Sequence, residues 1–282
     1  MDEKIRSKIG SERFEVRSCL GAGGMGVVYE AFDKLENKVV ALKTLQQLDA
    51  ESLYRFKKEF RALADLHHPN LINLGELIEE DGQWFFTMEL IRGPNFIEWV
   101  TRSFDESATS DTDLFDATPI SGDEDTRAFT EKPSRTPFDE TRLRKGLHQL
   151  ASGLVALHEA NQIHRDIKPS NILVTEDERV VLLDFGLVMA STPDAQTQTT
   201  GLIEGTAAYM APEQAAGAPT GTSADWYAMG VTLFEALTGQ HPFTGPPLQV
   251  LMVKQSTPSP APNELIDGLP DDLDALCADL LK

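Results

Sequence analysis

The chain has 282 residues, of which 41% are hydrophobic, and its 25 basic and 45 acidic side chains give a net charge of −20. This composition excludes a wholly disordered protein, because enough apolar surface is present to build a core. The acidic balance argues against nucleic acid and anionic lipid as primary partners. No apolar run reaches the ~18 residues that span a bilayer, and the N-terminus has no apolar signal segment, so we expect no membrane segment in this chain.

The chain contains two cysteines, Cys19 and Cys277. Two cysteines are too few for a disulfide framework or a thiolate metal site, and they suit a reducing compartment. We therefore expect a cytoplasmic location for the part of the protein that this sequence covers.

The N-terminal third predicts a small sheet with one helix. Short apolar runs at residues 39–42 and 84–88 are typical of strands. Between them, residues 51–66 carry apolar side chains at helical spacing, and Pro69 is expected to stop that helix because the residue before a proline resists the helical conformation.

Residues 101–138 differ from the rest of the chain. They hold twelve Ser or Thr, nine Asp or Glu and three Pro, with little apolar periodicity. Such a composition buries too little surface to offset the loss of chain entropy. We expect a disordered acidic insertion.

Helices dominate the pattern after residue 139. A leucine stripe from Leu143 to Leu157 predicts a helix of about four turns. Residues 180–183 form a short strand that ends at Asp184, residues 226–237 are apolar on nearly every side and predict a buried helix, and a last helix begins near Pro270.

Four glycines occur within residues 21–26. Glycine lets backbone amides approach a phosphate closely, although an isolated glycine-rich segment is as often a plain hairpin turn. A dinucleotide-binding fingerprint would open a helix, whereas residues 27–31 continue as a strand. The alternative is a strand–loop–strand that lies over a nucleotide.

Lys43 ends an apolar strand, and Glu59 lies on the following helix. A carboxylate that holds this lysine would let it neutralise phosphate charge. By themselves the two residues favour a solvated surface pair of little energetic value.

Residues 164–171 are far more specific, because they place Asp166, Lys168 and Asn171 within six positions. Asp166 has the chemistry to accept a hydroxyl proton, Lys168 to neutralise a transferred phosphoryl group and Asn171 to offer a carbonyl oxygen to a metal ion. Asp184 follows directly after a strand and supplies a hard oxygen of the kind Mg²⁺ prefers. The glycine-rich segment, Lys43, residues 164–171 and Asp184 are very unlikely to occur in this order by chance.

With these motifs the sequence resembles the eukaryotic-type (Hanks-type) serine/threonine protein kinase family, most closely its bacterial branch. The resemblance runs from about residue 14 to the end, apart from the insertion, and includes residues 211–213 and Asp225. It implies an α+β, bilobal fold: an antiparallel-sheet lobe with one helix at 1–91, and a larger, mainly helical lobe at 92–282.

The resemblance also implies a site for ATP and Mg²⁺ (or Mn²⁺). Asp166, Lys168, Lys43 and Glu59 are the expected catalytic residues, with Lys43 on the phosphates and Glu59 bracing it. Asn171 and Asp184 are the expected metal ligands. The expected nucleotide-binding residues, besides Lys43, are Leu20, Gly21, Ala22, Gly23, Gly24, Met25, Gly26, Val28, Ala41, Met88, Glu89, Ile91 and Leu173.

Lys168 and Thr206 match the serine/threonine pattern, so a protein carrying a Ser or Thr acceptor is the expected substrate. Thr197, Thr199 and Thr200 are candidate autophosphorylation sites, whose phosphate would pair with Arg165. Relatives also make a homodimer for autophosphorylation a partner to consider.

Other features of the resemblance concern packing. His164 is expected to pack against Leu63, Leu74 and Phe185 and to be anchored by Asp225. In the family Glu213 pairs with an arginine further along, and no such arginine is present here, so Glu213 is expected to lack that partner.

Three other functions compete with an active protein kinase. A pseudokinase scaffold would be favoured by loss of Lys43, Asp166 or Asp184, and all three are present. Small-molecule phosphotransferases also bind the metal through acidic residues, but they lack segments equivalent to residues 205–206 and 211–213 of this chain. A pure interaction module has only the acidic insertion in its favour.

Overall fold

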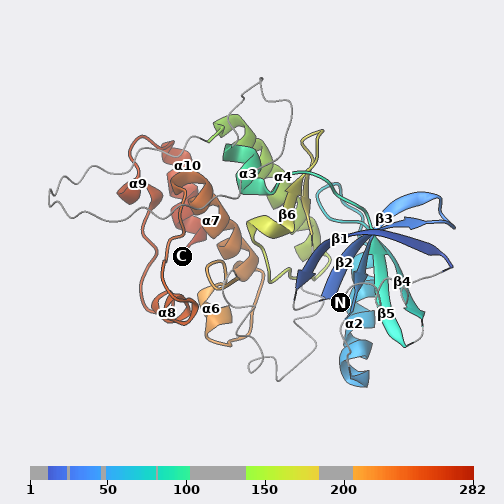
Figure 1. Cartoon of the computed structure of the whole chain (residues 1–282). Coiled ribbons are helices and arrows are strands. Elements are labelled where there is room, and N and C mark those ends of the chain that lie inside the picture. Colours follow the sequence, from blue (N-terminus) through green and yellow to red (C-terminus); the bar gives the residue numbers. More distant parts are fainter. Residues whose placement is uncertain (1–11, 24–25, 46–48, 81, 102–137, 184–205) are drawn as a thin grey trace, which may run out of the picture.

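The computed structural model describes residues 12–23, 26–45, 49–80, 82–101, 138–183 and 206–282, and these form an antiparallel sheet lobe followed by a helical lobe (Figure 1). The fold is α+β, as predicted. The division after residue 91 stays a prediction. Among the described helices, none combines the length and the apolar character needed to cross a membrane.

The first lobe is a five-stranded sheet with strand order β1-β2-β3-β5-β4, and all neighbouring strands are antiparallel. The predicted strands at 39–42 and 84–88 are both present and slightly longer than expected. The strands are β1 (Phe14–Gly23), β2 (Gly26–Asp33), β3 (Lys38–Thr44), β4 (Leu74–Glu80) and β5 (Gln83–Met88).

Each face of this sheet buries its own set of apolar side chains. One face carries a small cluster that includes Phe14, Tyr29, Leu42 and Phe85. On the other face Phe86 packs against the helix α2 (Ala50–Ala64), with its ring 5.4 Å from that of Phe60. Because successive side chains along β5 point to opposite faces of the sheet, Phe85 and Phe86 pack into different apolar clusters.

Helix α2 begins at its cap Asp49, whose carboxylate accepts a hydrogen bond of 2.8 Å from the Ser52 N–H. Such a cap satisfies one of the free N–H groups of the first turn. The helix ends at Ala64, before the predicted stop at Pro69 is reached.

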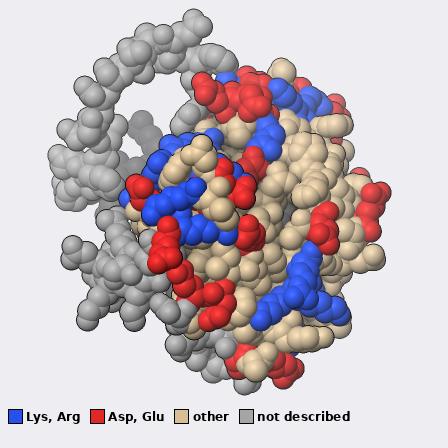
Figure 2. All heavy atoms as spheres, turned by 90° about the vertical axis from the view of Figure 1, so that its right-hand side faces the viewer, with Lys and Arg blue, Asp and Glu red and all other residues tan. Residues whose placement is uncertain are grey.

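Acidic and basic side chains are interspersed on the sheet side of the molecule (Figure 2). Arg13, just before β1, forms ion pairs with Asp33 and Glu76, each at 2.8 Å, and Arg92 reaches Glu30 at the same distance. On this side the net negative charge is therefore not gathered into one acidic surface.

The second lobe is built around α7 (Ser223–Thr238), which is buried along nearly its whole length, as the apolar pattern predicts. The leucine stripe of α4 (Glu140–Glu159) is also buried as predicted. The other elements are α3 (Phe96–Thr101), η1 (Pro169–Asn171), β6 (Ile172–Val174), β7 (Val180–Leu182), α6 (Pro212–Ala215), α8 (Pro247–Val253), α9 (Pro262–Leu265) and α10 (Asp271–Leu280).

The predicted insertion lies outside the described residues, except for Thr101 and Phe138 at its two ends. The Asp139 N–H donates to the Val100 carbonyl at 2.8 Å, so the chain leaves α3 and re-enters at α4 in nearly the same place. Because the entropic cost of closing a loop rises only slowly with its length, a long connection between these two points costs little more than a short one.

Gly26 gives a test of the glycine-rich segment. Its φ is +130°, and a Cβ built there would lie 1.9 Å from the Thr44 carbonyl oxygen. We expect Gly26→Ala to lower the free energy of unfolding by about 2–4 kcal/mol, measured by urea denaturation. The matched control is Gly21→Ala, because a Cβ at Gly21 meets no atom within 4 Å. Equal stability of the two variants would contradict this account.

Candidate active site

The segment 164–171 is anchored by the carboxylate of Asp225 in α7. The backbone N–H groups of His164 and Arg165 each donate to this carboxylate at 2.8 Å, and the His158 ring nitrogen Nε2 lies 2.8 Å from it. The carboxylate is fully buried, so these bonds compensate a charge that would otherwise be costly. Helix α7 therefore fixes where the segment begins.

The His164 ring connects the segment to the strand β7. Its Nε2 lies 2.7 Å from the Leu183 carbonyl oxygen and so carries the proton, while its Nδ1 accepts a longer bond of 3.3 Å from the Asp166 N–H. The side chain is completely buried. The predicted anchoring of His164 by Asp225 is confirmed, whereas Phe185 lies outside the described residues.

Three side chains meet at the centre of the site. The Lys168 ammonium donates to both carboxylate oxygens of Asp166, at 2.9 and 3.0 Å, and to the Thr206 hydroxyl at 3.0 Å. The Thr206 contact joins residues 38 apart in sequence. A carboxylate, a cation and a hydroxyl in one cluster can position an acceptor hydroxyl, take its proton and offset negative charge.

Asn171 lies on the other side of Asp166. Its amide nitrogen donates to the Asp166 backbone carbonyl at 2.7 Å and to a carboxylate oxygen at 2.9 Å. The amide oxygen is then the part of this side chain left to ligate a metal ion. The Leu183 N–H donates to the Asn171 carbonyl at 2.8 Å, which brings the end of β7 to this point. Asp184, the next residue, lies outside the described part of the chain.

The predicted nucleotide residues of the sheet share one face. Val28 pairs with Lys43 across β2 and β3, and Ala41 pairs with Met88 across β3 and β5. Directly paired residues present their side chains on the same face, and so do residues two apart on one strand. The four side chains therefore line the face that also carries Phe86.

The glycine-rich segment forms the end of the β1–β2 hairpin, as the strand–loop–strand interpretation predicts. Gly21 pairs with Val28, Ala22 with Val27 and Gly23 with Gly26. Leu20 is half exposed on β1. The expected residues Gly24 and Met25 lie outside the described part of the chain, as do Thr197, Thr199 and Thr200.

The structure does not bring Glu59 into an ion pair with Lys43. Lys43 is buried on β3, whereas Glu59 is half-buried on α2 and no ion pair joins the two among the described residues. Burial raises the pKa of Glu59, and the positive charge of Arg165 opposes this shift most strongly. The rotation of a helix against a sheet decides this contact, and sequence spacing does not give it. The bracing role of Glu59 stays a prediction.

The link between the lobes begins with Glu89. Its backbone N–H donates to the Asn73 carbonyl at 2.9 Å. Its carboxylate accepts from the Asn73 amide at 3.1 Å and forms an ion pair with Arg179. Sequence reasoning missed Asn73 and Arg179, because no local motif marks residues that meet only in the folded chain.

Two further residues that are expected to bind the nucleotide are Ile91 and Leu173. Ile91 follows Glu89 and is half-buried. Leu173 is half-buried in β6, where it forms an isolated bridge with Asn95 at the start of α3. The structure thus connects Leu173 to the segment that enters the second lobe.

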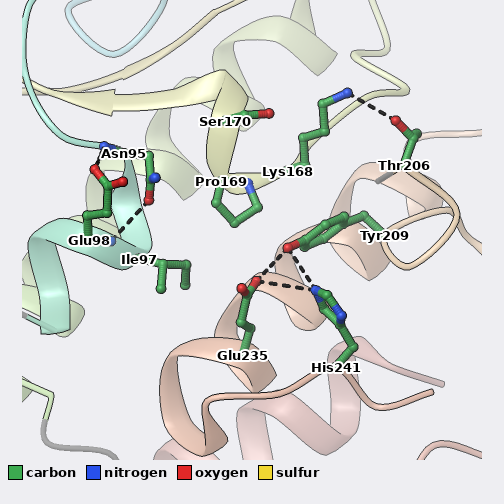
Figure 3. A pocket seen from close by; sticks show the side chains of 10 residues that line it. All are labelled: Asn95, Ile97, Glu98, Lys168, Pro169, Ser170, Thr206, Tyr209, Glu235 and His241. Atoms are coloured by element: carbon green, nitrogen blue, oxygen red, sulfur yellow. Dashed lines mark hydrogen bonds and ion pairs between the residues drawn. The ribbon is translucent and has the colours of Figure 1, made fainter. Parts of the chain in front are cut away.

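A pocket of about 590 Å³ opens beside Lys168 (Figure 3). On the side opposite Asn95, the Tyr209 hydroxyl donates to the Glu235 carboxylate at 2.5 Å, and the His241 ring lies 3.0 Å from the same hydroxyl. Burial, and then the Glu235 contact, raise the pKa of Tyr209 well above its usual range. Sequence reasoning did not identify this wall. Ten residues line the pocket: Asn95, Ile97, Glu98, Lys168, Pro169, Ser170, Thr206, Tyr209, Glu235 and His241.

Glu213 at the start of α6 is half-buried and accepts a hydrogen bond of 3.1 Å from the Ser223 hydroxyl. No lysine or arginine pairs with it within the described ranges, and the lack of the family's arginine partner stays a prediction. The neighbouring Gln214 joins two segments, because its amide accepts from the Ala211 N–H and donates to the Arg165 carbonyl, each at 3.0 Å.

Comparison with known proteins agrees with this geometry. The family model described as "Protein kinase domain" matches residues 14–282. Serine/threonine-protein kinase PknE of Mycobacterium tuberculosis is 31% identical over 99% of this chain and 44% of its own length. PknL of the same organism is 31% identical over 98% of this chain and 62% of its own length.

A third relative is the probable serine/threonine-protein kinase PknB of Lactococcus lactis, which is 30% identical over 89% of this chain and 36% of its own length. The chain therefore spans less than two thirds of the length of each of these curated relatives.

We expect Asp225→Asn to loosen the anchoring of the segment 164–171. An asparagine has one acceptor oxygen in place of two, so one backbone N–H of the segment would face an NH₂ group and lose its hydrogen bond. This loss should lower the free energy of unfolding by about 1–3 kcal/mol. The melting temperature and the turnover rate should both fall, whereas ATP affinity, measured by calorimetry, should change little. The exposed Asp177→Asn is the control, and an Asp225→Asn variant as stable as this control would refute the anchoring role.

Proposed function

Because the chain belongs to the protein kinase family, we propose that it transfers the γ-phosphoryl group of ATP to serine or threonine hydroxyls of other proteins. One observation carries this proposal: the Lys168 ammonium contacts both the Asp166 carboxylate and the Thr206 hydroxyl beside a pocket of about 590 Å³. The names of the related serine/threonine-protein kinases support the choice of serine and threonine.

The acceptor hydroxyl would lie against Asp166, which orients it and takes its proton as the new O–P bond forms. The bond between the γ-phosphorus and the bridging oxygen breaks, and ADP leaves with the electron pair of that bond. Lys168 offsets the negative charge that spreads over the transferred group. Such transfer depends on positioning and electrostatics more than on covalent chemistry by the protein.

ATP would lie against the sheet face that carries Val28, Ala41, Lys43 and Met88. Lys43 would approach the α- and β-phosphates, with Glu59 as its brace in the nucleotide-bound state, and residues 20–26 would cover the phosphates. The Glu89 carbonyl and the Ile91 N–H would bind adenine, and Leu173 would close the pocket from the second lobe.

Protein kinases use ATP with a divalent metal, and we propose Mg²⁺, with Mn²⁺ as a substitute. The amide oxygen of Asn171 fits this use, because the amide nitrogen of the same side chain is taken by Asp166. Asp184 would be the second ligand. A bound metal supplies charge neutralisation at the phosphates.

The proposal extends to location and self-modification. A cytoplasmic site of action suits a domain that consumes ATP and whose two cysteines are free. Autophosphorylation on Thr197, Thr199 or Thr200, within a transient homodimer, would add charge able to pair with Arg165. A triple alanine variant that keeps full activity would reject the regulatory part of this proposal.

The direct test is ³²P transfer from Mg-ATP to a generic basic protein. We expect label on serine or threonine, and Asp166→Asn should lower the rate by about 10²–10⁴-fold, the usual contribution of a general base. The matched control Asp279→Asn removes an exposed carboxylate on α10 and should keep the wild-type rate. ATP binding without any transfer would favour the pseudokinase alternative.

Metal dependence tests the role of Asn171 separately. Chelation with EDTA should abolish transfer, and added Mg²⁺ or Mn²⁺ should restore it. Asn171→Ala should raise the metal concentration needed for half-maximal rate by about 10-fold or more, because one of few ligands is removed. An unchanged metal requirement together with a lower rate would show that Asn171 only orients Asp166.

A further inference from the structure

Lys254 is a buried cation that the proposed reaction does not use. It follows the helix α8, and only 4% of its surface is exposed. Its ammonium donates to the backbone carbonyls of Ala207 at 2.8 Å, Ala208 at 2.9 Å and Met210 at 2.7 Å. Burying a charged ammonium is costly unless it is fully hydrogen-bonded. A charge buried in this way calls for a specific role.

The three carbonyls satisfy all three donors of the ammonium. No carboxylate lies within ion-pair distance of Lys254 in the described part of the chain, and the centroid of the Tyr227 ring lies 5.6 Å from its ammonium. Burial lowers the pKa of Lys254 to about 8. This lysine is therefore directed at backbone and does not balance a negative side chain.

The backbone that Lys254 holds is the segment 206–210. At its start, the Thr206 hydroxyl contacts the catalytic Lys168, and the same residue's carbonyl accepts from the N–H groups of Tyr209 and Met210. In its middle, Tyr209 forms one wall of the pocket beside Lys168 (Figure 3). The segment thus connects Lys254, which follows α8, to the place where an acceptor would lie.

We infer that Lys254 is a positioning residue for the protein substrate: by fixing the segment 206–210, it keeps Thr206 on Lys168 and Tyr209 in the pocket wall. This inference rests on the proposed kinase function. Lys254 touches neither the reacting atoms nor the nucleotide face of the sheet. Its loss should therefore affect use of the acceptor and leave ATP binding unchanged.

An apolar residue of similar size would fill the same space but leave three carbonyls without partners. Small displacements of a positioned group can cost a large part of a rate. Arginine keeps the charge and several donors, although its planar head fits three converging carbonyls less well than an ammonium does. Lys254→Met and Lys254→Arg therefore separate packing from hydrogen bonding.

The test uses the whole chain and steady-state kinetics with a serine peptide and with ATP as the varied substrates. For Lys254→Met we expect kcat/KM for the peptide to fall about 10–100-fold, while KM for ATP stays within about twofold. Lys254→Arg should recover most of the loss. Lys145→Met, which removes an exposed lysine on α4, is the control and should match the wild type.

A double-mutant cycle with Thr206→Val shows whether the effect runs through the segment. If Lys254 acts by placing Thr206, the two losses should be clearly less than additive. Additive losses, or parallel losses of peptide and ATP parameters that follow the melting temperature, would overturn the positioning role in favour of a general structural one. A Lys254→Met variant with wild-type kinetics would also overturn it.

Hydrogen exchange of residues 206–211 gives a readout that needs no catalysis. We expect faster exchange in Lys254→Met than in the wild type and in Lys145→Met. A wild-type chain that transfers no phosphate would reject the proposed function, and the exchange result would still decide whether Lys254 holds the segment. Unchanged exchange would reject that role.

Discussion

The arrangement of the site depends on one buried carboxylate, that of Asp225. It lies in α7, the most buried of the helices that the structure describes, and accepts hydrogen bonds from the two backbone N–H groups that open the segment 164–171. A helix packed on most of its sides cannot easily move, so the core fixes the position of the segment through this helix. The anchored backbone in turn places the candidate catalytic and metal-binding side chains of Asp166, Lys168 and Asn171.

A second set of interactions reaches the same point from the opposite direction. Lys254 holds the segment 206–210 by its carbonyls, and Thr206 at the start of that segment contacts Lys168. The acceptor side of the site is thus fixed between two elements of the helical lobe. The register of β2, β3 and β5 places Lys43 on the sheet face that we propose binds the nucleotide.

Sequence reasoning captured what local pattern controls. Helical spacing predicted α2 and α4, and a run that is apolar on nearly every side predicted α7. The motifs predicted the fold and the cluster around Asp166 through the family that they resemble. It could not give contacts that depend on how elements pack. Arg179 meets Glu89 across 90 positions, Glu59 is not paired with Lys43, and Lys254 finds its partners in backbone that carries no sequence signal. Each of these depends on orientation, which periodicity does not encode.

The most direct test of this account is a crystal structure of the chain with Mg²⁺, a non-hydrolysable ATP analogue and a serine peptide. The account predicts the serine hydroxyl within hydrogen-bond distance of the Asp166 carboxylate. It also predicts that Asp225 still holds the backbone of His164 and Arg165, and that Lys254 still holds the three carbonyls of the segment 206–210. A serine hydroxyl bound away from Asp166, or a catalytic segment released from Asp225 in the complex, would contradict it.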